Sequence, residues 1–268
     1  MLCMLKIFCS QYTGGKRNSL PGLRQQEVLT PIGQGILHQE YGGALMKEVR
    51  LVEIKEEILS DNKSVADELR KKMQERRTYL LNLMSSPGAG KTSLILKTIE
   101  KLRDEFRMGV IEGDIESMVD SEKVAAQGIS AVQLRTGGFC HLDVAMVKKG
   151  LEAMDLDRLD FLIIENVGNL VCPAEFDTGA TKNAMILSVP EGDDKPLKYP
   201  LMFTICDVLL VNKIDYLDYE DFDMDAMRER VLNLNPKIKI MEVSCKTGQG
   251  IDTWINWLKD EIRPFIGR

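Results

Sequence analysis

Short apolar runs of four to six residues recur along the chain from residue 79 onward, and helical patterns of apolar residues separate most of them. The runs predict β-strands at residues 79–84, 108–111, 131–134, 161–164, 185–189, 208–211 and 238–243. The stretches between them predict helices at residues 92–106, 121–126, 142–154, 223–232 and 252–266. Continuous apolar strands that alternate with helices are typical of a mostly parallel sheet flanked by helices on both faces, so the sequence predicts an α/β fold.

The first 77 residues follow a different pattern. Residues 1–45 hold two glycine pairs and no periodic apolar stripe, which predicts a disordered extension or an upstream start of translation. The alternative for this segment is a short extra subdomain. Residues 46–77 predict an N-terminal helical segment, in which Ser64 is the expected N-cap of a helix. The predicted α/β domain then occupies residues 78–268.

Net charge and cysteine content limit the possible binding partners and the cellular compartment. Lys and Arg total 35 against 41 Asp and Glu, a net charge of −6, so we expect no general affinity for nucleic acid or for an anionic membrane. No apolar run approaches the roughly 18 residues of a membrane span, and residues 1–9 lack the basic start of a secretory signal. The six scattered cysteines favour a reducing cytoplasm, where a special cysteine is a metal ligand or a reactive thiol.

A glycine-rich loop follows the first strand of the α/β domain. Residues 85–92 have the sequence Ser-Ser-Pro-Gly-Ala-Gly-Lys-Thr, which matches the P-loop pattern G-x-x-x-x-G-K-[ST] except that Ser85 stands at the first glycine position. Such a loop turns backbone N–H groups toward phosphate oxygens at a helix N-terminus, while Lys91 attracts the β- and γ-phosphates and Thr92 can ligate Mg²⁺. The expected phosphate-binding residues are Gly88, Ala89, Gly90, Lys91, Thr92 and Ser93.

Two later loops predict which base is bound. Strand 208–211 ends in Asn212-Lys213-Ile214-Asp215, and strand 238–243 ends in Ser244-Cys245-Lys246. A carboxylate at Asp215 can accept two hydrogen bonds from guanine N1–H and the 2-amino group, a donor pair that adenine lacks. The second loop can donate a backbone N–H to guanine O6. The sequence therefore predicts GTP and GDP as ligands, held by Asn212, Lys213, Asp215, Ser244, Cys245 and Lys246.

Acidic residues follow two other strands, at the sheet edge where open α/β folds bind ligands. Asp114 is expected to act through Mg²⁺ or to orient the attacking water, and Glu165 begins a Glu-x-x-Gly switch in which Gly168 can donate its N–H to the γ-phosphate. The alternative for each acid is a solvated strand end. The predicted catalytic residues are Lys91, Asp114 and Glu165, and the predicted Mg²⁺ ligands are Thr92 and Asp114. Asn169, not glutamine, follows Gly168, and we therefore expect slow hydrolysis.

Cysteine and histidine come together at one place in the sequence. Cys140 and His141 are adjacent in a loop before the predicted helix 142–154, and Cys172 follows the switch. Two thiolates and an imidazole make a soft site suited to Zn²⁺ or Ni²⁺. Three ligands cannot close a tetrahedral shell, so a second copy of the chain, a water or a fourth local group must complete it. On spacing alone, a core cysteine and a helix-capping histidine explain the same residues.

In combination, these motifs resemble the HypB family of P-loop GTPases that help to insert nickel into [NiFe]-hydrogenase. The resemblance extends from about Met46 to the C-terminus and rests on residues 85–92, 136–143, 165–172, 191–200 and 212–215. It implies a P-loop NTPase fold, GTP hydrolysis, dimerisation linked to nucleotide, and Ni²⁺ or Zn²⁺ at Cys140, His141 and Cys172. It also implies HypA and the hydrogenase large subunit as partners. The sequence contains neither the N-terminal Cys-x-x-Cys-Gly-Cys motif nor the His-rich tract of some members.

Two other functions fit parts of this pattern. A nickel or cobalamin chaperone GTPase for another client, such as urease, would share both the nucleotide motifs and the metal ligands. A regulatory GTPase switch without metal would share only the nucleotide motifs. The metal content of the purified protein separates the chaperones from the regulatory switch.

Overall fold

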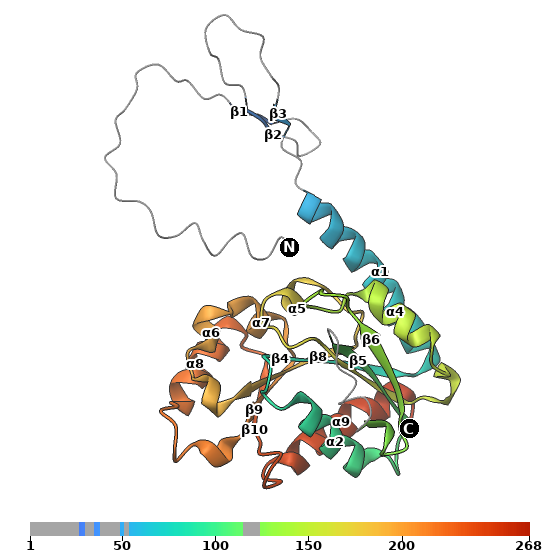
Figure 1. Ribbon diagram of the computed structural model, residues 1–268, viewed down its shortest axis with the longest axis vertical. Helices are drawn as coiled ribbons and strands as arrows, with labels where there is room; N and C mark the ends of the chain where they lie inside the picture. Colours follow the sequence, from blue (N-terminus) through green and yellow to red (C-terminus); the bar gives the residue numbers. More distant parts are fainter. Residues whose placement is uncertain (1–26, 30–34, 38–48, 51–53, 115–123) are drawn as a thin grey trace, which may run out of the picture. The chain divides into compact units, whose positions relative to one another are not determined.

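A seven-stranded sheet forms the centre of the unit that spans residues 55–268 (Figure 1). In this computed structural model the described residues are 27–29, 35–37, 49–50, 54–114 and 124–268, with side chains described for 61–113 and 124–268. The strands are β4 (Tyr79–Ser85), β5 (Met108–Asp114), β6 (Ser130–Arg135), β7 (Phe161–Glu165), β8 (Lys182–Ser188), β9 (Val208–Asn212) and β10 (Lys239–Glu242). All seven predicted strands are confirmed, and every neighbouring pair is parallel.

The strand order places the ends of β4 and β7 side by side. The order is β10-β9-β8-β4-β7-β5-β6, so the chain leaves β4 for β5 and β6, returns to β7, and then crosses to β8. Leu83 of β4 is opposite Glu165 of β7 on one side and Ala184 of β8 on the other. The connections diverge at this point, and open α/β sheets bind ligands outside the carboxyl ends of the strands at such a position.

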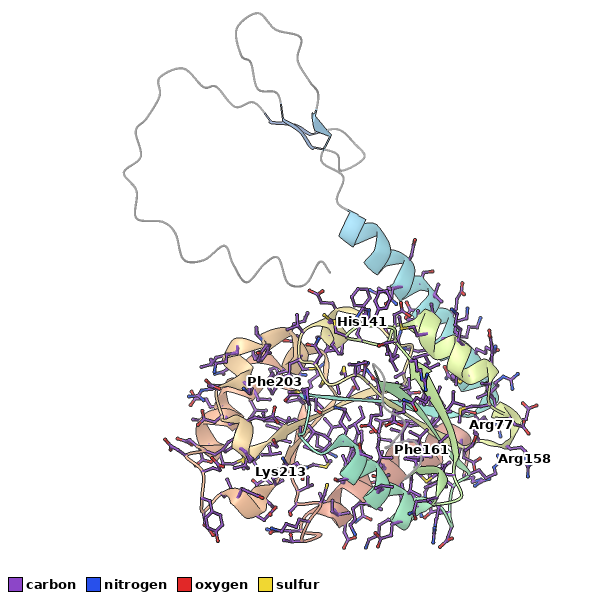
Figure 2. The ribbon with its side chains drawn as sticks, in the orientation of Figure 1. Arg77, His141, Arg158, Phe161, Phe203 and Lys213 are labelled. Carbon is purple, nitrogen blue, oxygen red and sulfur yellow. The ribbon has the colours of Figure 1, made fainter. Side chains whose placement is uncertain are left out.

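Helices cover both faces of the sheet (Figure 1). They are α1 (Ile54–Arg76), α2 (Lys91–Leu102), α4 (Val144–Glu152), α5 (Cys172–Glu175), α6 (Lys195–Lys198), α7 (Pro200–Ile205), α8 (Met224–Leu234) and α9 (Ile251–Ile266). Residues of α2 and α9 share one core with Phe161 of β7, whereas Phe203 of α7 belongs to a core on the other face; both rings are fully buried (Figure 2). Alternate strand residues point to opposite faces, which is why continuous apolar strands fill both cores.

The predicted helices differ from the observed ones mainly at their ends. Ser64 is not an N-cap, because α1 begins ten positions earlier, at Ile54. Residues 54–63 are mostly good helix formers and extend the helix beyond the serine. The first half of the predicted helix at 121–126 lies outside the described residues, and residues 124 and 125 are helical. The short helices α5, α6 and α7 have four to six residues and lack a helical apolar period long enough to detect.

The chain divides into two compact units, residues 1–54 and 55–268. The first contains β1 (Glu27–Leu29), β2 (Gly35–Leu37) and β3 (Val49–Arg50), which form a three-stranded antiparallel sheet. Most of the predicted extension, 1–45, lies outside the described residues, so its disorder stays a prediction. In the part of the chain that the structure describes, no helix has both the length and the apolar character needed to cross a membrane.

Candidate functional site

The loop between β4 and α2 has the backbone of a phosphate-binding turn. Gly88 has a φ of 75° and Gly90 a φ of 110°. Residues other than glycine rarely adopt these backbone conformations. A Cβ at Gly90 would also lie 2.4 Å from Nδ2 of Asn212. Gly90 precedes Lys91, the first residue of α2. The loop therefore leads to a helix N-terminus, where the first backbone N–H groups have no helical acceptor and can bind an anion such as phosphate.

Ser85, at the first glycine position of the P-loop pattern, has a role of its own. Nζ of Lys91 donates to Oγ of Ser85 at 3.0 Å, and that hydroxyl donates to the carbonyl of Ser86 at 2.7 Å. Ser85 is fully buried and Lys91 is 9% exposed. Ser85 therefore holds the Lys91 ammonium against the predicted phosphate-binding loop.

Thr92, predicted as a Mg²⁺ ligand, is in contact with Glu165, which was predicted as a catalytic residue. Oγ1 of Thr92 donates to Oε1 of Glu165 at 3.0 Å, although 73 positions separate the two residues. The contact forms because α2 starts beside the end of β7. Hydroxyl and carboxylate oxygens are the ligands that Mg²⁺ prefers, so this pair fits the predicted cation.

Glu112 is a candidate that the sequence pattern did not reveal. The predicted strand ended at Ile111, but β5 continues to Asp114. Glu112 is opposite Glu165 in the parallel register and is 5% exposed, so the two acidic residues occupy the same face of the sheet. The backbone of Asp114 pairs with Arg135 at the strand end; its side chain lies outside the described part of the protein, and its role stays a prediction.

Gly168 packs directly on the phosphate loop. A Cβ at this position would lie 3.0 Å from three atoms of Pro87, a tighter contact than most side chains accept. The glycine of the predicted switch therefore lies beside the P-loop, as contact with a γ-phosphate requires.

Hydrogen bonds join the three nucleotide motifs. Asn212 donates from Nδ2 to the carbonyl of Ala89 at 2.9 Å and accepts at Oδ1 from the N–H of Cys245 at 3.3 Å. Nζ of Lys213 donates to the carbonyl of Gly88 at 2.8 Å. Asn212 therefore acts as a connector between the phosphate loop and the two predicted base-binding loops.

Asp215 faces a cavity of about 240 Å³ at these loops. The cavity is lined by Gly90, Ser93, Asn212, Lys213, Asp215, Tyr216, Cys245 and Lys246. Oδ1 of Asp215 accepts from the Ser244 hydroxyl at 2.6 Å, and Nζ of Lys246 lies 3.7 Å from Oδ2. The Ser244 hydrogen bond lowers the pKa of the Asp215 carboxyl, so the group is ionised at neutral pH. Oδ2 is buried and makes no hydrogen bond within the described residues, which leaves an acceptor for a ligand.

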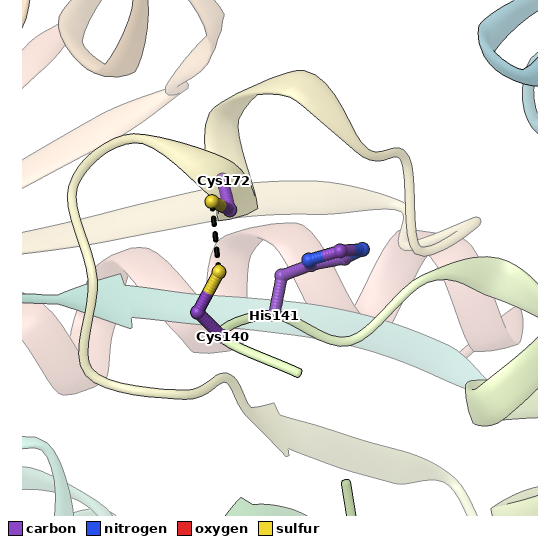
Figure 3. A group of neighbouring side chains, drawn as sticks. All are labelled: Cys140, His141 and Cys172. Atoms are coloured by element: carbon purple, nitrogen blue, oxygen red, sulfur yellow. Dashed lines mark hydrogen bonds between the residues drawn. The ribbon is translucent and has the colours of Figure 1, made fainter. Parts of the chain in front are cut away.

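The two thiols and the imidazole meet in one cluster (Figure 3). One ligand atom from each of Cys140, His141 and Cys172 lies within 4.8 Å of the others, and the two sulfur atoms are 2.8 Å apart. Cys172 is the first residue of α5, whereas the other two precede α4. Because 32 positions separate the two cysteines, only the fold brings them together.

The surroundings of His141 suit the neutral form that a metal ligand needs. Its ring stacks on Phe176 with centroids 3.9 Å apart, and it is 8% exposed. Burial lowers the pKa of the imidazole, which keeps the ring nitrogens available to a metal at neutral pH. Nδ1 is buried with no hydrogen-bond partner among the described residues. A helix-capping role does not fit, because Asp143 caps α4 by accepting from the N–H of Met146.

A buried asparagine positions the histidine loop. Oδ1 of Asn166 accepts from the N–H of Leu142 at 3.0 Å, and its Nδ2 donates to Asn82 of β4 at 3.2 Å. Asn166 is fully buried. It lies inside the predicted Glu-x-x-Gly switch, but the sequence offered no sign that its amide would reach the residue after His141.

Comparison with known proteins agrees with this arrangement. A family model described as "CobW/HypB/UreG, nucleotide-binding domain" matches residues 79–242. The "Hydrogenase maturation factor HypB" of Escherichia coli (strain K12) is 41% identical over 233 residues, 85% of this chain and 80% of the relative. The protein of the same name from Azotobacter chroococcum is 44% identical over 229 residues, 85% of this chain and 74% of the relative.

A solved structure shows the same fold. The crystal structure of HypB from Helicobacter pylori in complex with nickel superposes with a TM-score of 0.72 at 38% identity, and covers 76% of this chain and 96% of its own. The alternating strands and helices, the P-loop, the guanine-type loops and the cysteine–histidine cluster thus occur in a chain that belongs to the HypB family of P-loop nucleotide-binding proteins.

Proposed function

We propose that this protein is a GTP-hydrolysing nickel chaperone that assists nickel insertion into [NiFe]-hydrogenase. The observation that carries the proposal is the position of the cysteine–histidine cluster. Cys172 lies four residues after Gly168, which packs on the phosphate loop. A metal site that shares a segment with a nucleotide switch can bind its cargo in one nucleotide state and release it in the other.

The base-binding loops support guanine. Asp215 is an ionised carboxylate that lines the cavity: its Oδ1 accepts from Ser244, and its Oδ2 accepts no hydrogen bond within the described residues, although the Lys246 ammonium lies 3.7 Å away. Guanine supplies the two N–H donors that such a group accepts. Adenine would leave the buried acceptor unpaired at a cost of about 1–3 kcal/mol.

The phosphate loop and its neighbours support hydrolysis. Lys91 supplies a positive charge for the phosphates, and Thr92 with Glu165 offers oxygen ligands to Mg²⁺. Asp114 is proposed either as a further Mg²⁺ ligand or as the residue that orients the attacking water. A bound Mg²⁺ would neutralise charge on the phosphates, and the protein residues contribute mainly by positioning, as phosphoryl transfer requires.

The cluster supports nickel as cargo rather than as a permanent structural metal. Thiolates and a neutral imidazole suit Ni²⁺ and also Zn²⁺. Three ligands from one chain leave the coordination shell open, and Phe139 and Val171 beside them are 58% and 46% exposed. We propose that a second copy of the chain docks here, and that a HypA protein and the hydrogenase large subunit receive the metal in turn.

Nickel titrations test the function directly. Ni²⁺ is added to protein loaded with GDP or with a non-hydrolysable GTP analogue, and bound metal and oligomeric state are measured together. We expect nickel to bind and its affinity to differ between the two nucleotides, with dimers favoured in the state that binds metal more tightly. A chain that binds no nickel in either state would instead be a metal-free regulatory switch.

Asp215 is expected to set base choice. Asp215→Asn exchanges an acceptor for donors, so GTP affinity should fall by about five- to 150-fold, equivalent to about 1–3 kcal/mol, while xanthosine triphosphate gains affinity. Nucleotide titrations measure both changes, and Asp218→Asn, an exposed neighbour, serves as the matched control. Asp215 does not contact the base if the variant binds GTP normally and still rejects the xanthosine analogue.

A further inference from the structure

Asn169 makes hydrogen bonds to the phosphate loop and to the two segments that carry the cysteines of the cluster. Its backbone N–H donates to the carbonyl of Ser85 at 2.9 Å. Its Oδ1 accepts from the N–H of Val171 at 2.8 Å, and its Nδ2 reaches the carbonyl of Cys140 at 3.4 Å. Val171 directly precedes Cys172, so one side chain contacts the segments that carry both thiols.

Through its backbone N–H, Asn169 is connected by Ser85 to the ammonium group of Lys91. Ser85 presents its carbonyl to Asn169 and its hydroxyl to the ammonium of Lys91. A phosphate that draws Lys91 toward itself competes for this hydroxyl bond and alters the position of Ser85. Because Asn169 is bonded to the same residue, the change reaches it without an intervening flexible segment.

The side chain of Asn169 points toward the metal cluster rather than toward a water on the phosphate. Oδ1 accepts a hydrogen bond from the N–H of Val171, and this bond fixes the start of α5, where Cys172 lies. The contact from Nδ2 to Cys140 is 3.4 Å, longer than the usual 2.7–3.2 Å of an N–H···O bond. A small movement of the switch would shorten or break this contact, and would shift the two thiols relative to each other.

We infer that Asn169 is the positioning residue that couples nucleotide state to metal affinity. This inference rests on the proposed function and adds the residue through which the coupling acts. Asn169 need not touch either ligand. It acts through Ser85 on one side and through the backbone of Cys140 and Val171 on the other, and a network of discrete hydrogen bonds can carry coupling of this kind.

The measured quantity is the ratio of the Ni²⁺ dissociation constants in the GDP-loaded and GTP-analogue-loaded protein. The parent ratio is expected to be fivefold or more, and Asn169→Ala should bring it to within about twofold of one. Both thiols and the imidazole remain, so nickel still binds. Asn169→Asp keeps the acceptor for Val171 and loses the donor toward Cys140, so an intermediate ratio is expected. A parent-like ratio in Asn169→Ala overturns the inference.

Asn235→Ala separates coupling from general destabilisation. Asn235 is also half-buried, and its amide donates to the backbone carbonyls of Phe203, Thr204 and Cys206, none of which is a residue of the cysteine–histidine cluster or of the phosphate loop. Asn235→Ala should lower thermal stability at least as much as Asn169→Ala does. It should keep the parent's ratio of Ni²⁺ dissociation constants in the two nucleotide states. A lost ratio in this control would show that any destabilisation has the same effect, and would also overturn the inference.

The parent titration distinguishes the two levels of the proposal. A parent that binds nickel with equal affinity in both nucleotide states overturns the role of Asn169 but keeps the cluster as a nickel site. A parent that binds no nickel overturns the proposed function itself.

Discussion

Lys91→Ala is expected to reduce GTP hydrolysis by about 10²- to 10³-fold, the usual effect of removing one well-placed donor to developing transition-state charge. The Lys91 ammonium is held by Ser85 at the start of the phosphate loop, where it can neutralise the β- and γ-phosphates. Alanine is a good helix former at the first position of α2, so the fold should survive. Phosphate release measures the activity, and circular dichroism measures the fold.

Lys97→Ala provides the matched control for this variant. Lys97 lies on the same helix, is partly exposed and pairs with the exposed Glu100 at 2.9 Å. An exposed pair of this kind contributes little to stability, so turnover should be that of the parent. Parent-like hydrolysis in Lys91→Ala, with an unchanged spectrum, would remove the P-loop assignment.

Cys172→Ala should weaken Ni²⁺ binding by about 100-fold or more, because even residues that only support a metal ligand change affinity by about 10–100-fold. It should also remove the nucleotide dependence of binding, since Cys172 is the proposed ligand that follows the switch. In the parent, a tenfold difference between nucleotide states corresponds to about 1.4 kcal/mol. By reciprocity, nickel must change the relative affinity for GTP analogue and GDP by the same factor.

Cys206→Ala is the control for loss of a buried thiol. Cys206 is 2% exposed, packs among apolar residues of α7 and β9, and is not one of the three residues of the cluster. Its replacement should lower stability modestly and leave nickel affinity unchanged. Normal nickel binding by Cys172→Ala would disprove the ligand assignment, whereas equal affinities of the parent in both nucleotide states would disprove the coupling alone.

The nucleotide loops could be predicted because each is a local sequence that follows a strand. The P-loop of residues 85–92 and the Asn212-Lys213-x-Asp215 motif need only a strand before them and a parallel sheet to bring them to one edge. Glu112 was missed for a related reason. The acidic residue ended the apolar run, so the predicted strand stopped before the place where β5 places it beside Glu165.

The sequence alone determined the α/β architecture and predicted the P-loop and the base-binding loops, because these patterns involve only a few neighbouring residues. It also proposed Cys140, His141 and Cys172 as ligands, but spacing could not choose between a metal site and ordinary core residues. Only the tertiary structure shows that the two thiols, 32 positions apart, lie together. It also shows that Asp143, not His141, is the N-cap of α4. Likewise, only packing revealed that Ser85 holds Lys91 and that Asn169 joins the phosphate loop to the cluster. These contacts join separate segments, and their geometry depends on how parallel strands and helices pack rather than on any local pattern.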